Sequence, residues 1–449
     1  MTSLRLKHFV PSLLLLLPVV LLPQSPTLAT ARSSAGPTIT LTYYWWAESD
    51  VPGADNWMHQ TIALFEKAHP NIRIKLDIQS NDTLQSNFAA AAVAHSGPDI
   101  ATQWATMPVL SQAWSGAIVP LNGLIPASEM KHWVGTAENA YGGKVWGMPL
   151  YLIGTPVVYN KTLFSKAGLD PNKPPTTWAE FLSACAKLKA KGIIPFAMGN
   201  KDGFAGAWFW NTFGKGSLNS VNDVKRAVVG QTHFTDPQFT SWLTALQTMR
   251  SSGYLNNDVA SLDLNNGTTP FVKGQAAMTF TTDANVVSFA HVLGEANVGV
   301  FREPSIGNGK LASFYDVTQS SSEMITSWSK HQTEAAMFLM FMHTPERLAA
   351  LNHSTSAFPA DDRFNTHTIS DPLQRQMLSW DLGLHSVWLE NFVPTQLDSN
   401  GDQIAGETVT SNGGSPGTAA QLWERTARQW RASNPTMMKQ FSAWIGPAS

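Results

Sequence analysis

The chain has 449 residues, 14% charged side chains and a formal net charge of −2 at pH 7. So small a charge imbalance does not favour binding to nucleic acid or to an anionic membrane surface. The length predicts two or more domains. With 17 Trp and 22 Phe, the chain has more large rings than one core requires, so we expect some to line a binding cleft.

The N-terminus has the features of a secretory signal. Arg5 and Lys7 precede an apolar run over residues 9–22, and the small residues Ala29-Thr30-Ala31 follow. A basic end, an apolar middle and a small-residue site predict export and cleavage after Ala31. The apolar run of about 14 residues is shorter than the roughly 20 that span a bilayer as a helix.

Cys185 is the only cysteine, so the chain forms no internal disulfide. A lipid-anchored protein of this kind carries its lipid on a cysteine directly after the cleavage site. Cys185 lies far from that position, and this favours a protein that diffuses freely in a periplasm. Its neighbours Phe181 and Leu188 share one face of a predicted helix, which indicates a buried core thiol.

Strands and helices alternate in the first part of the chain. Ile72, Ile74, Leu76 and Ile78 alternate with polar residues, which is typical of a strand with one polar face. Strand, helix, strand in succession predicts crossover units on a parallel sheet. The expected elements are strands at 39–44, 72–78 and 99–102 and helices at 56–68 and 83–94.

The same theme recurs after a predicted hairpin at 142–147. Thr177 and Glu180 have the spacing of a capping box, which predicts a helix that ends at Gly192. The C-terminal third is expected to be helical, with a flexible Gly-rich loop at 406–417. The other expected elements are strands at 155–159, 193–198, 276–281 and 297–301 and a helix at 237–252.

Aromatic residues follow several of these strands. Trp45-Trp46 ends the first strand and precedes Glu48, Trp104 ends the third strand, and Trp208-Phe209-Trp210 follows the strand at 193–198 in a Gly-rich stretch. Open α/β sheets bind ligands at the carboxyl ends of their strands. Sugars pack their C–H faces on aromatic rings, so these positions predict a carbohydrate-binding cleft.

Motifs for catalysis or metal binding are weak. The sequence has no His-Glu-x-x-His zinc motif, phosphate-binding loop or dinucleotide fingerprint. Asp398 to Asp402 has the beginning of a calcium loop, but Gln403 and Val409 stand where such a loop needs Gly and Glu. We therefore interpret it as a solvated acidic turn, and predict no catalytic residue, cofactor or metal.

A series of short segments resembles the extracellular solute-binding proteins of the type 1, maltose-binding-protein-like group, which serve ABC sugar importers. Their order and spacing extend over nearly the whole chain after the signal. The segments are Ile39–Trp46, Leu64–Pro70, Gly97–Ile100, Tyr141–Pro149, Val158–Lys161, Leu163–Phe164, Ala167–Leu169, Thr177–Phe181 and Phe271–Thr279.

The resemblance implies an α/β fold of two lobes, the type II periplasmic-binding-protein fold. Each lobe is an open, mostly parallel sheet flanked by helices. It also implies a monomer that needs no cofactor, closes about its hinges on a small carbohydrate, and delivers it to the permease subunits of an ABC importer. The expected N-terminal lobe comprises 32–150 and 302–345, the C-terminal lobe 151–301 and 346–449, with hinges near 150–156 and 301–314.

The resemblance also implies ligand contacts. The family often follows its Ala-Met-Thr strand with an aromatic turn, whereas this chain keeps the acid Asp283 and lacks the ring. A Gly-rich stretch of the family is replaced here by Tyr315 and Asp316, which we expect to reach the cleft. The full set of expected contacts is Trp45, Trp46, Glu48, Trp104, Tyr151, Trp208, Trp210, Asp283, Tyr315 and Asp316.

Other functions remain open at this point. A glycoside-cleaving enzyme would use two carboxylates, such as Glu48 and Asp283. A receptor for a polyamine or another small solute would use acids with aromatic rings. An anionic ligand would need basic residues at strand ends, and Lys144 and Arg302 are the only candidates. A sensory receptor cannot be separated from a transport receptor by sequence.

Overall fold

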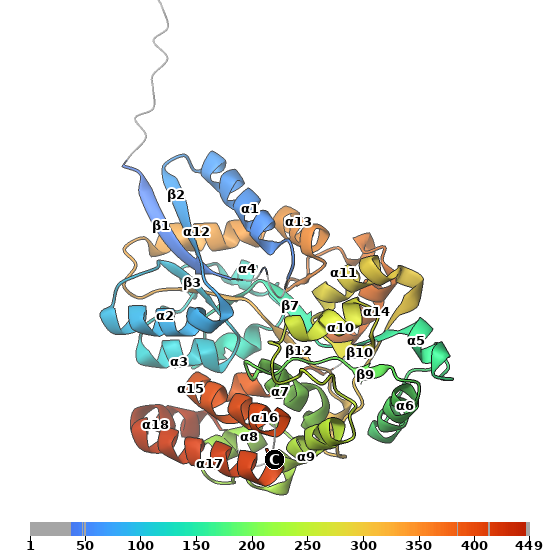
Figure 1. The fold of residues 1–449 in the computed structure, drawn as a ribbon. Helices are drawn as coiled ribbons and strands as arrows, with labels where there is room; N and C mark the ends of the chain where they lie inside the picture. Colours follow the sequence, from blue (N-terminus) through green and yellow to red (C-terminus); the bar gives the residue numbers. More distant parts are fainter. Residues whose placement is uncertain (1–36, 47, 49–50, 384, 412–413, 446–449) are drawn as a thin grey trace, which may run out of the picture. The chain divides into compact units, whose positions relative to one another are not determined.

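The computed structural model describes residues 37–46, 48, 51–383, 385–411 and 414–445 (Figure 1). The predicted signal, residues 1–31, lies outside the described residues. Among the helices that are described, none is both long enough and apolar enough to cross a membrane.

The first sheet contains five strands in the order β2-β1-β3-β13-β6. β1 pairs in parallel with β2 and β3, as the alternating strand and helix pattern predicts, whereas β13 runs antiparallel to β3 and β6. Leu41 and Tyr43 of β1 are buried in the core. The strands are β1 (Ile39–Trp45), β2 (Ile72–Ile78), β3 (Ile100–Gln103), β6 (Met148–Pro149) and β13 (Ser322–Ile325).

Helices from two distant parts of the chain pack around this sheet. Phe65 of α1 meets Phe338 of α12 edge to face, with ring centroids 5.0 Å apart. α13 packs against α1 as well, and Figure 1 shows α12 and α13 beside it. The helices are α1 (Ala54–Ala68), α2 (Asn81–Ala94), α3 (Met107–Ser115), α4 (Ala127–Met130), α12 (Gln332–Met342) and α13 (Pro345–Thr355), and the predicted hairpin is β4 (Ala140–Tyr141) with β5 (Lys144–Val145).

The second sheet has four strands in the order β11-β8-β10-β9. β9 and β10 are parallel, but β8 runs antiparallel to both of its neighbours, so this sheet is mixed rather than mostly parallel. The reason is that the chain enters β8 directly from the crossing strand β7, without an intervening crossover helix. The strands are β8 (Val157–Asn160), β9 (Ile194–Phe196), β10 (Ala276–Phe280) and β11 (Val298–Phe301).

Most remaining helices surround the second sheet. Thr177 and Glu180 form the predicted capping box at the start of α6. α16 packs against α7 and α9, so the orange and red C-terminal helices lie beside green ones in Figure 1. The helices are α5 (Lys161–Lys166), α6 (Trp178–Ala190), α7 (Phe204–Phe209), α8 (Val221–Val228), α9 (Pro237–Ser251), α10 (Thr269–Val272), α11 (Asp283–Leu293), α14 (Pro372–Gly383), α15 (Thr395–Leu397), α16 (Gln403–Thr410), α17 (Pro416–Ser433) and α18 (Pro435–Trp444).

A small three-stranded sheet, β12-β7-β14, lies where the chain passes between the two larger sheets. β7 (Tyr151–Gly154) connects β6 to β8, and β12 (Val317–Gln319) connects β11 to β13. β7 is also antiparallel to β14 (Phe358–Pro359). The chain passes between the two sheets three times, through β7, β12 and β14, which agrees with a two-lobed fold, and β7 falls within the first expected hinge. The exact lobe boundaries stay a prediction.

Two segments predicted as loops are helical in whole or in part, since the predicted loop at 406–417 begins in one helix and ends in the next. Gly406 lies inside α16 and Gly417 inside α17, and Trp208 to Trp210 lies on α7 and the π-helix η2 (Trp210–Gly214) that continues it. Both predictions took glycine as a loop signal. Here glycine provides close packing: a Cβ on Gly206 would lie 2.8 Å from the Cα of Gly406, so the absence of side chains lets α7 and α16 approach each other.

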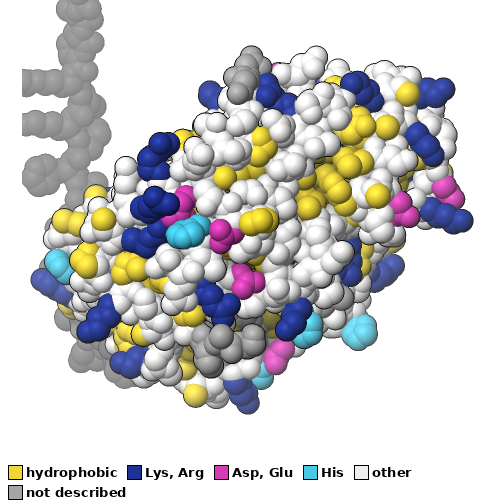
Figure 2. All heavy atoms as spheres, turned by 90° about the horizontal axis from the view of Figure 1, so that it is seen from below, with side chains coloured by type: hydrophobic (Ala, Val, Ile, Leu, Met, Phe, Trp, Pro, Cys, Tyr) yellow, Lys and Arg dark blue, Asp and Glu magenta, His cyan; other side chains and the backbone are white. Residues whose placement is uncertain are grey.

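The buried and exposed surfaces agree with the sequence analysis where it can be compared. Cys185 is fully buried, and burial raises the pKa of its thiol. On the face shown in Figure 2, Lys and Arg side chains are scattered among neutral and acidic ones instead of forming one continuous patch.

Candidate functional site

A pocket of about 270 Å³ opens where two of the crossing strands meet helices of the second sheet. Ile153 of β7 and Thr318 of β12 form part of its wall, and Trp104, which follows β3 of the first sheet, forms another part. The lining residues are Gln85, Trp104, Pro108, Ile153, Asp202, Phe204, Trp208, Leu264, Thr318, Ser320, Trp388, Glu390, Asn391, Val393, Thr395, Asp398, Ser399 and Gln403. Residues attached to both large sheets therefore contribute to one cavity.

Three tryptophan rings line this pocket. Trp104 packs edge-on against Trp46 at a centroid distance of 5.5 Å, and Trp208 packs edge-on against Trp388 at the same distance. Trp208 and Trp388 are only 7% and 4% exposed. Rings held in this way are rigid apolar surfaces, suited to flat apolar faces of a small ligand.

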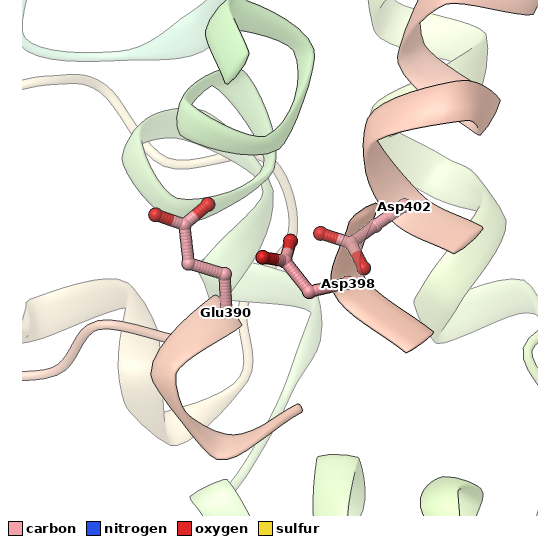
Figure 3. Close-up of side chains that lie close together, drawn as sticks. All are labelled: Glu390, Asp398 and Asp402. Atoms are coloured by element: carbon pink, nitrogen blue, oxygen red, sulfur yellow. The ribbon is translucent and has the colours of Figure 1, made fainter. Parts of the chain in front are cut away.

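Three acidic side chains converge at one side of the pocket, and we call them the acidic wall (Glu390, Asp398 and Asp402). Glu390 and Asp398 line the pocket, whereas Asp402 does not. Glu390 begins the short 3-10 helix η8 (Glu390–Phe392), two residues after Trp388. The two aspartates lie at the ends of the π-helix η9 (Asp398–Asp402). One carboxylate oxygen of each lies within 4.8 Å of the others. In Figure 3 the Asp398 and Asp402 carboxylates point toward each other, with Glu390 on the other side of Asp398.

Few donors reach the acidic wall. Trp388 Nε1 donates to Glu390 Oε1 at 2.6 Å, and Gln403 Nε2 donates to Asp398 Oδ2 at 3.1 Å. The carboxyl groups of Asp398 and Asp402 hydrogen-bond to each other. Among the described residues, no other donor is found for Asp402, for Asp398 Oδ1 or for the second Glu390 oxygen. Asp402 is 0% exposed, so its carboxyl group is kept from water as well.

Burial and mutual repulsion govern the protonation of the acidic wall. Burial raises the pKa of Asp398 to about 6. Burial, and then the neighbouring Asp398 carboxylate, hold the pKa values of Glu390 and Asp402 well above the usual range. An uncompensated carboxylate in a low-dielectric site retains its proton until a positive partner is supplied.

The charge of the pocket lining is negative, whereas an anionic ligand would require positively charged side chains. Asp202, Glu390 and Asp398 are acidic, and no Lys, Arg or His is among the described residues that line the pocket. Lys144 is exposed on the hairpin, and Arg302 donates to the backbone of Ser313 at 3.0 Å. The acidic wall is also the one place in the described chain where three possible metal-ligating side chains converge.

The structure places two predicted site residues, Trp104 and Trp208, in the pocket wall. Trp46 lies behind Trp104 and supports its ring. Trp45 and Trp210 are fully buried, the latter against Trp242 and Trp423. The pattern of a ring after a strand could not separate wall residues from core residues, because both follow strands.

The other predicted residues lie elsewhere. Glu48 is exposed, and its carboxylate accepts hydrogen bonds from the N–H groups of Gly53 and Asp55 at 2.9 Å each, which caps the start of α1. Tyr151 is fully buried on β7. Neither residue lines the pocket, and direct ligand contact by any member of the predicted set stays a prediction.

The last predicted residues belong to buried polar networks near the crossing strands. Asp283 Oδ2 accepts from the Gly154 N–H at 3.1 Å, and burial raises its pKa to about 7 beside the carboxyl group of Asp381. Tyr315 packs so closely on Gly154 that a Cβ there would lie 2.9 Å from its ring. Asp316 pairs with Lys215, its Oδ1 3.3 Å from Nζ.

Sequence reasoning missed most of the C-terminal contribution. Trp388, Glu390 and Asn391 had no motif to reveal them. Asp398 and Asp402 were noticed, but they were interpreted as a solvated turn, and this was wrong because Asp402 is fully buried and η9 is helical. The available signal was the spacing of four between the two acids, which places both on one side of a helical turn.

Comparisons with known proteins agree with this geometry. The sn-glycerol-3-phosphate-binding periplasmic protein UgpB of Shigella flexneri serotype 5b is 30% identical over 218 residues. The match covers 46% of this chain and 47% of that protein, so the chain spans about half the length of the curated relatives it matches.

Solved structures match over a much larger part of the chain. A chitin oligosaccharide binding protein superposes with a TM-score of 0.77 at 22% identity, covering 88% of this chain and 99% of that one. The GacH receptor of Streptomyces glaucescens, solved unliganded and with acarbose, gives a TM-score of 0.70 at 19% identity, covering 88% and 98%. At these identities the likeness establishes the fold.

The family assignment rests on a direct match of the sequence. Residues 48–347, more than half of the chain, match the family described as bacterial extracellular solute-binding protein. The crossing strands, the two sheets and the pocket beside the crossing strands are consistent with that match. The chain therefore belongs to the bacterial extracellular solute-binding protein family.

Proposed function

We propose that this protein is the substrate-binding component of an ABC importer and captures a mono- or oligosaccharide in the pocket described above. The observation that carries the proposal is the pocket wall itself, in which Trp104, Trp208 and Trp388 stand among carboxylate, amide and hydroxyl groups. Aromatic faces bind the C–H surfaces of a sugar ring, and the polar groups bind its hydroxyls.

Capture proceeds by closure about the crossing strands. β7 and β12 carry two of the three chain crossings and contribute Ile153 and Thr318 to the pocket wall. A ligand that contacts residues from both lobes binds the closed form better and shifts the population toward it. The closed form is then the one that the permease subunits recognise.

The alternatives receive less support. The two acids suggested for a glycosidase are apart, because Glu48 caps α1 while Asp283 is buried at the start of α11. Residues 413–417 have the Gly-x-Ser-x-Gly spacing of a hydrolase elbow, but Ser415 instead accepts from the Thr418 N–H as the N-cap of α17. A phosphate ester would face a pocket with no basic lining residue among those described.

Export follows from the family and from the N-terminal sequence. The protein acts in the periplasm after cleavage near Ala31, as a monomer that needs no cofactor. N-terminal sequencing of protein isolated from the periplasmic fraction tests this, with Arg32 as the expected first residue. An intact N-terminus in the membrane fraction would contradict it.

The binding experiment is a thermal-shift screen of the purified protein against mono- and oligosaccharides, amino acids and polyamines. A ligand at a hundred times its dissociation constant adds about 2.7 kcal/mol of stability. We expect at least one saccharide to raise Tm, to be recovered intact, and to bind at least about tenfold more weakly to Trp208→Ala. A panel in which no saccharide raises Tm would overturn the proposal, and consumption of the saccharide would favour an enzyme.

A further inference from the structure

The carboxyl groups of the acidic wall converge without a basic side chain among the described residues. The carboxyl group of Asp402, which is 0% exposed, hydrogen-bonds to that of Asp398 and faces it (Figure 3). One oxygen of Glu390 and one of Asp398 have no donor among the described residues, although buried acids are normally paired or hydrogen-bonded. The buried Asp283 and Asp381 also meet without a cation, but only the acidic wall has members, Glu390 and Asp398, that line the pocket.

The same chain contains a buried group of acids that does have its cation. In this lysine cluster (Lys215, Glu303 and Asp316), Lys215 Nζ pairs with both carboxylates and donates to the Thr212 carbonyl at 2.7 Å. All three cluster side chains are at most 1% exposed. The fold thus buries carboxylates around a primary ammonium in one place and leaves an equivalent set without one in the pocket wall.

We propose that the acidic wall is a binding site for a primary ammonium group carried by the ligand. The inference rests on the proposed function and specifies it: the preferred ligand is an amino-bearing saccharide. Glu390 and Asp398 accept hydrogen bonds from the ammonium, and Asp402 adds a negative charge directly behind Asp398. Trp104, Trp208 and Trp388 hold the rest of the ligand.

The geometry fits an ammonium nitrogen. Such a nitrogen has three N–H donors, and charge-assisted N–H···O bonds are about 2.7–2.9 Å long. Donors in tetrahedral directions then reach acceptors roughly 4.6 Å apart, and Glu390 and Asp398, which line the pocket, offer oxygens within 4.8 Å of each other.

A divalent metal fits less well. Calcium takes six to eight oxygen ligands, whereas one oxygen of Glu390 and one of Asp398 already accept hydrogen bonds from the N–H groups of Trp388 and Gln403. Those N–H groups cannot ligate a cation. A primary amine needs only hydrogen-bond acceptors, which Glu390 and Asp398 supply, so it is the occupant that these observations favour.

Two sources supply this chemistry, an amino sugar or a polyamine, and the experiment separates them. Isothermal titration calorimetry at pH 7 compares a glucosamine oligosaccharide, its N-acetylated counterpart of equal length, spermidine, and calcium alone. We expect the glucosamine oligosaccharide to bind at least about tenfold more tightly than the N-acetylated one. Asp398→Asn and Glu390→Gln should lose that preference while still binding the N-acetylated compound to within about twofold.

Asp381→Asn is the matched control, since it neutralises a buried acid that does not line the pocket. It should leave the preference for the free amine intact. Retained binding of the neutral compound shows that each variant is folded, and Glu390→Gln serves if Asp398→Asn does not fold.

The outcomes separate the two proposals. Equal affinity for the free-amine and N-acetylated compounds overturns the ammonium site and leaves the saccharide function in place. Binding of spermidine without any saccharide supports the ammonium site and overturns the saccharide function. Binding of calcium alone, lost in Asp398→Asn, replaces the ammonium by a metal and overturns the inference. Failure of every probe overturns the ammonium site, and the wider saccharide panel then decides the saccharide function.

Discussion

The acidic wall and the lysine cluster pose the same electrostatic problem and have different solutions. Burial raises the pKa of Glu303 to about 7 and that of Asp398 to about 6. In the lysine cluster the charge of Lys215 opposes this rise, and the chain itself supplies the cation that pairs with both carboxylates. The acidic wall has no such internal cation among the described residues, and it lies at the pocket. The lysine cluster, which contains its own cation, therefore stabilises the fold. The acidic wall lacks a cation and is, on our proposal, completed by the ammonium group of a ligand.

The largest expected effect comes from removing the internal cation. Lys215→Met leaves Glu303 and Asp316 buried without a positive partner, and we expect it to lower the free energy of unfolding by about 3–5 kcal/mol at pH 7.5. Urea unfolding followed by tryptophan fluorescence measures this. A loss below about 1 kcal/mol would mean that the lysine cluster does not depend on Lys215 for its stability, and the contrast with the acidic wall would fail.

The second effect is a pH dependence of the unliganded protein. Asp398 and Glu303 have folded-state pKa values of about 6 and about 7, above the unfolded values of roughly 4. Between the unfolded and the folded pKa values, the folded state therefore binds more protons than the unfolded state. The stabilisation by these protons is complete below about pH 4 and is lost as the pH rises through the folded-state pKa values.

We expect the free energy of unfolding to fall by roughly 2–3 kcal/mol between about pH 5.5 and about pH 7.5 from these two groups. The charged groups that face them are Glu390 and Asp402 around Asp398, and Lys215 and Asp316 around Glu303. Urea titrations at several pH values test this, with Asp398→Asn expected to flatten part of the slope. Stability that rises over this range would contradict the assignment.

Neutralising one acid of the acidic wall should have the opposite sign to Lys215→Met. Asp402→Asn removes a buried carboxyl whose pKa is raised by burial and by Asp398, so the unliganded protein should gain about 1–2 kcal/mol at pH 7.5. The Tm of unliganded variant and parent, measured side by side, gives the result. A destabilised Asp402→Asn would indicate that this carboxyl is already paired in the unliganded protein.

The smallest expected effect concerns the orientation of Glu390. Trp388→Phe keeps an aromatic ring and removes the Nε1 donor that lies 2.6 Å from Glu390 Oε1. Loss of one such bond should cost about 1 kcal/mol of stability. Because the ring is retained, affinity for a neutral saccharide should change by less than about threefold, as titration calorimetry would measure. A tenfold loss would mean that the indole N–H contacts the ligand itself.

How far the sequence predicted the molecule differs between its two halves. Around the first sheet the alternation of Ile72, Ile74 and Leu76 with polar residues, and the helical periodicity between the strands, located the elements closely. Beyond residue 384 the sequence offered few such signals. Gly406 was interpreted as part of a loop, although its role is to let α16 approach Gly206 on α7, and close packing between helices leaves no periodic trace.

The candidate site shows the same division. Trp104 and Trp208 were predicted and lie in the pocket wall, but the similarly placed Trp45 and Trp210 are buried in the core. Whether a ring after a strand faces a cavity depends on what packs over it. For Trp210 that is Trp423 of α17, more than two hundred positions away in the chain.

The sequence by itself determined the local features: the strands and helices of the first sheet, the capping box of α6, the buried thiol, and the segments that identify the family. These depend on neighbours within a few positions, so hydrophobic period and capping chemistry encode them. Only the tertiary structure decided that Glu390 meets Asp398 and Asp402 beside three tryptophan rings, and that Lys215 neutralises one group of acids and not the other. Those contacts join residues far apart in sequence, and the burial that gives them their charge properties arises only when the chain is packed.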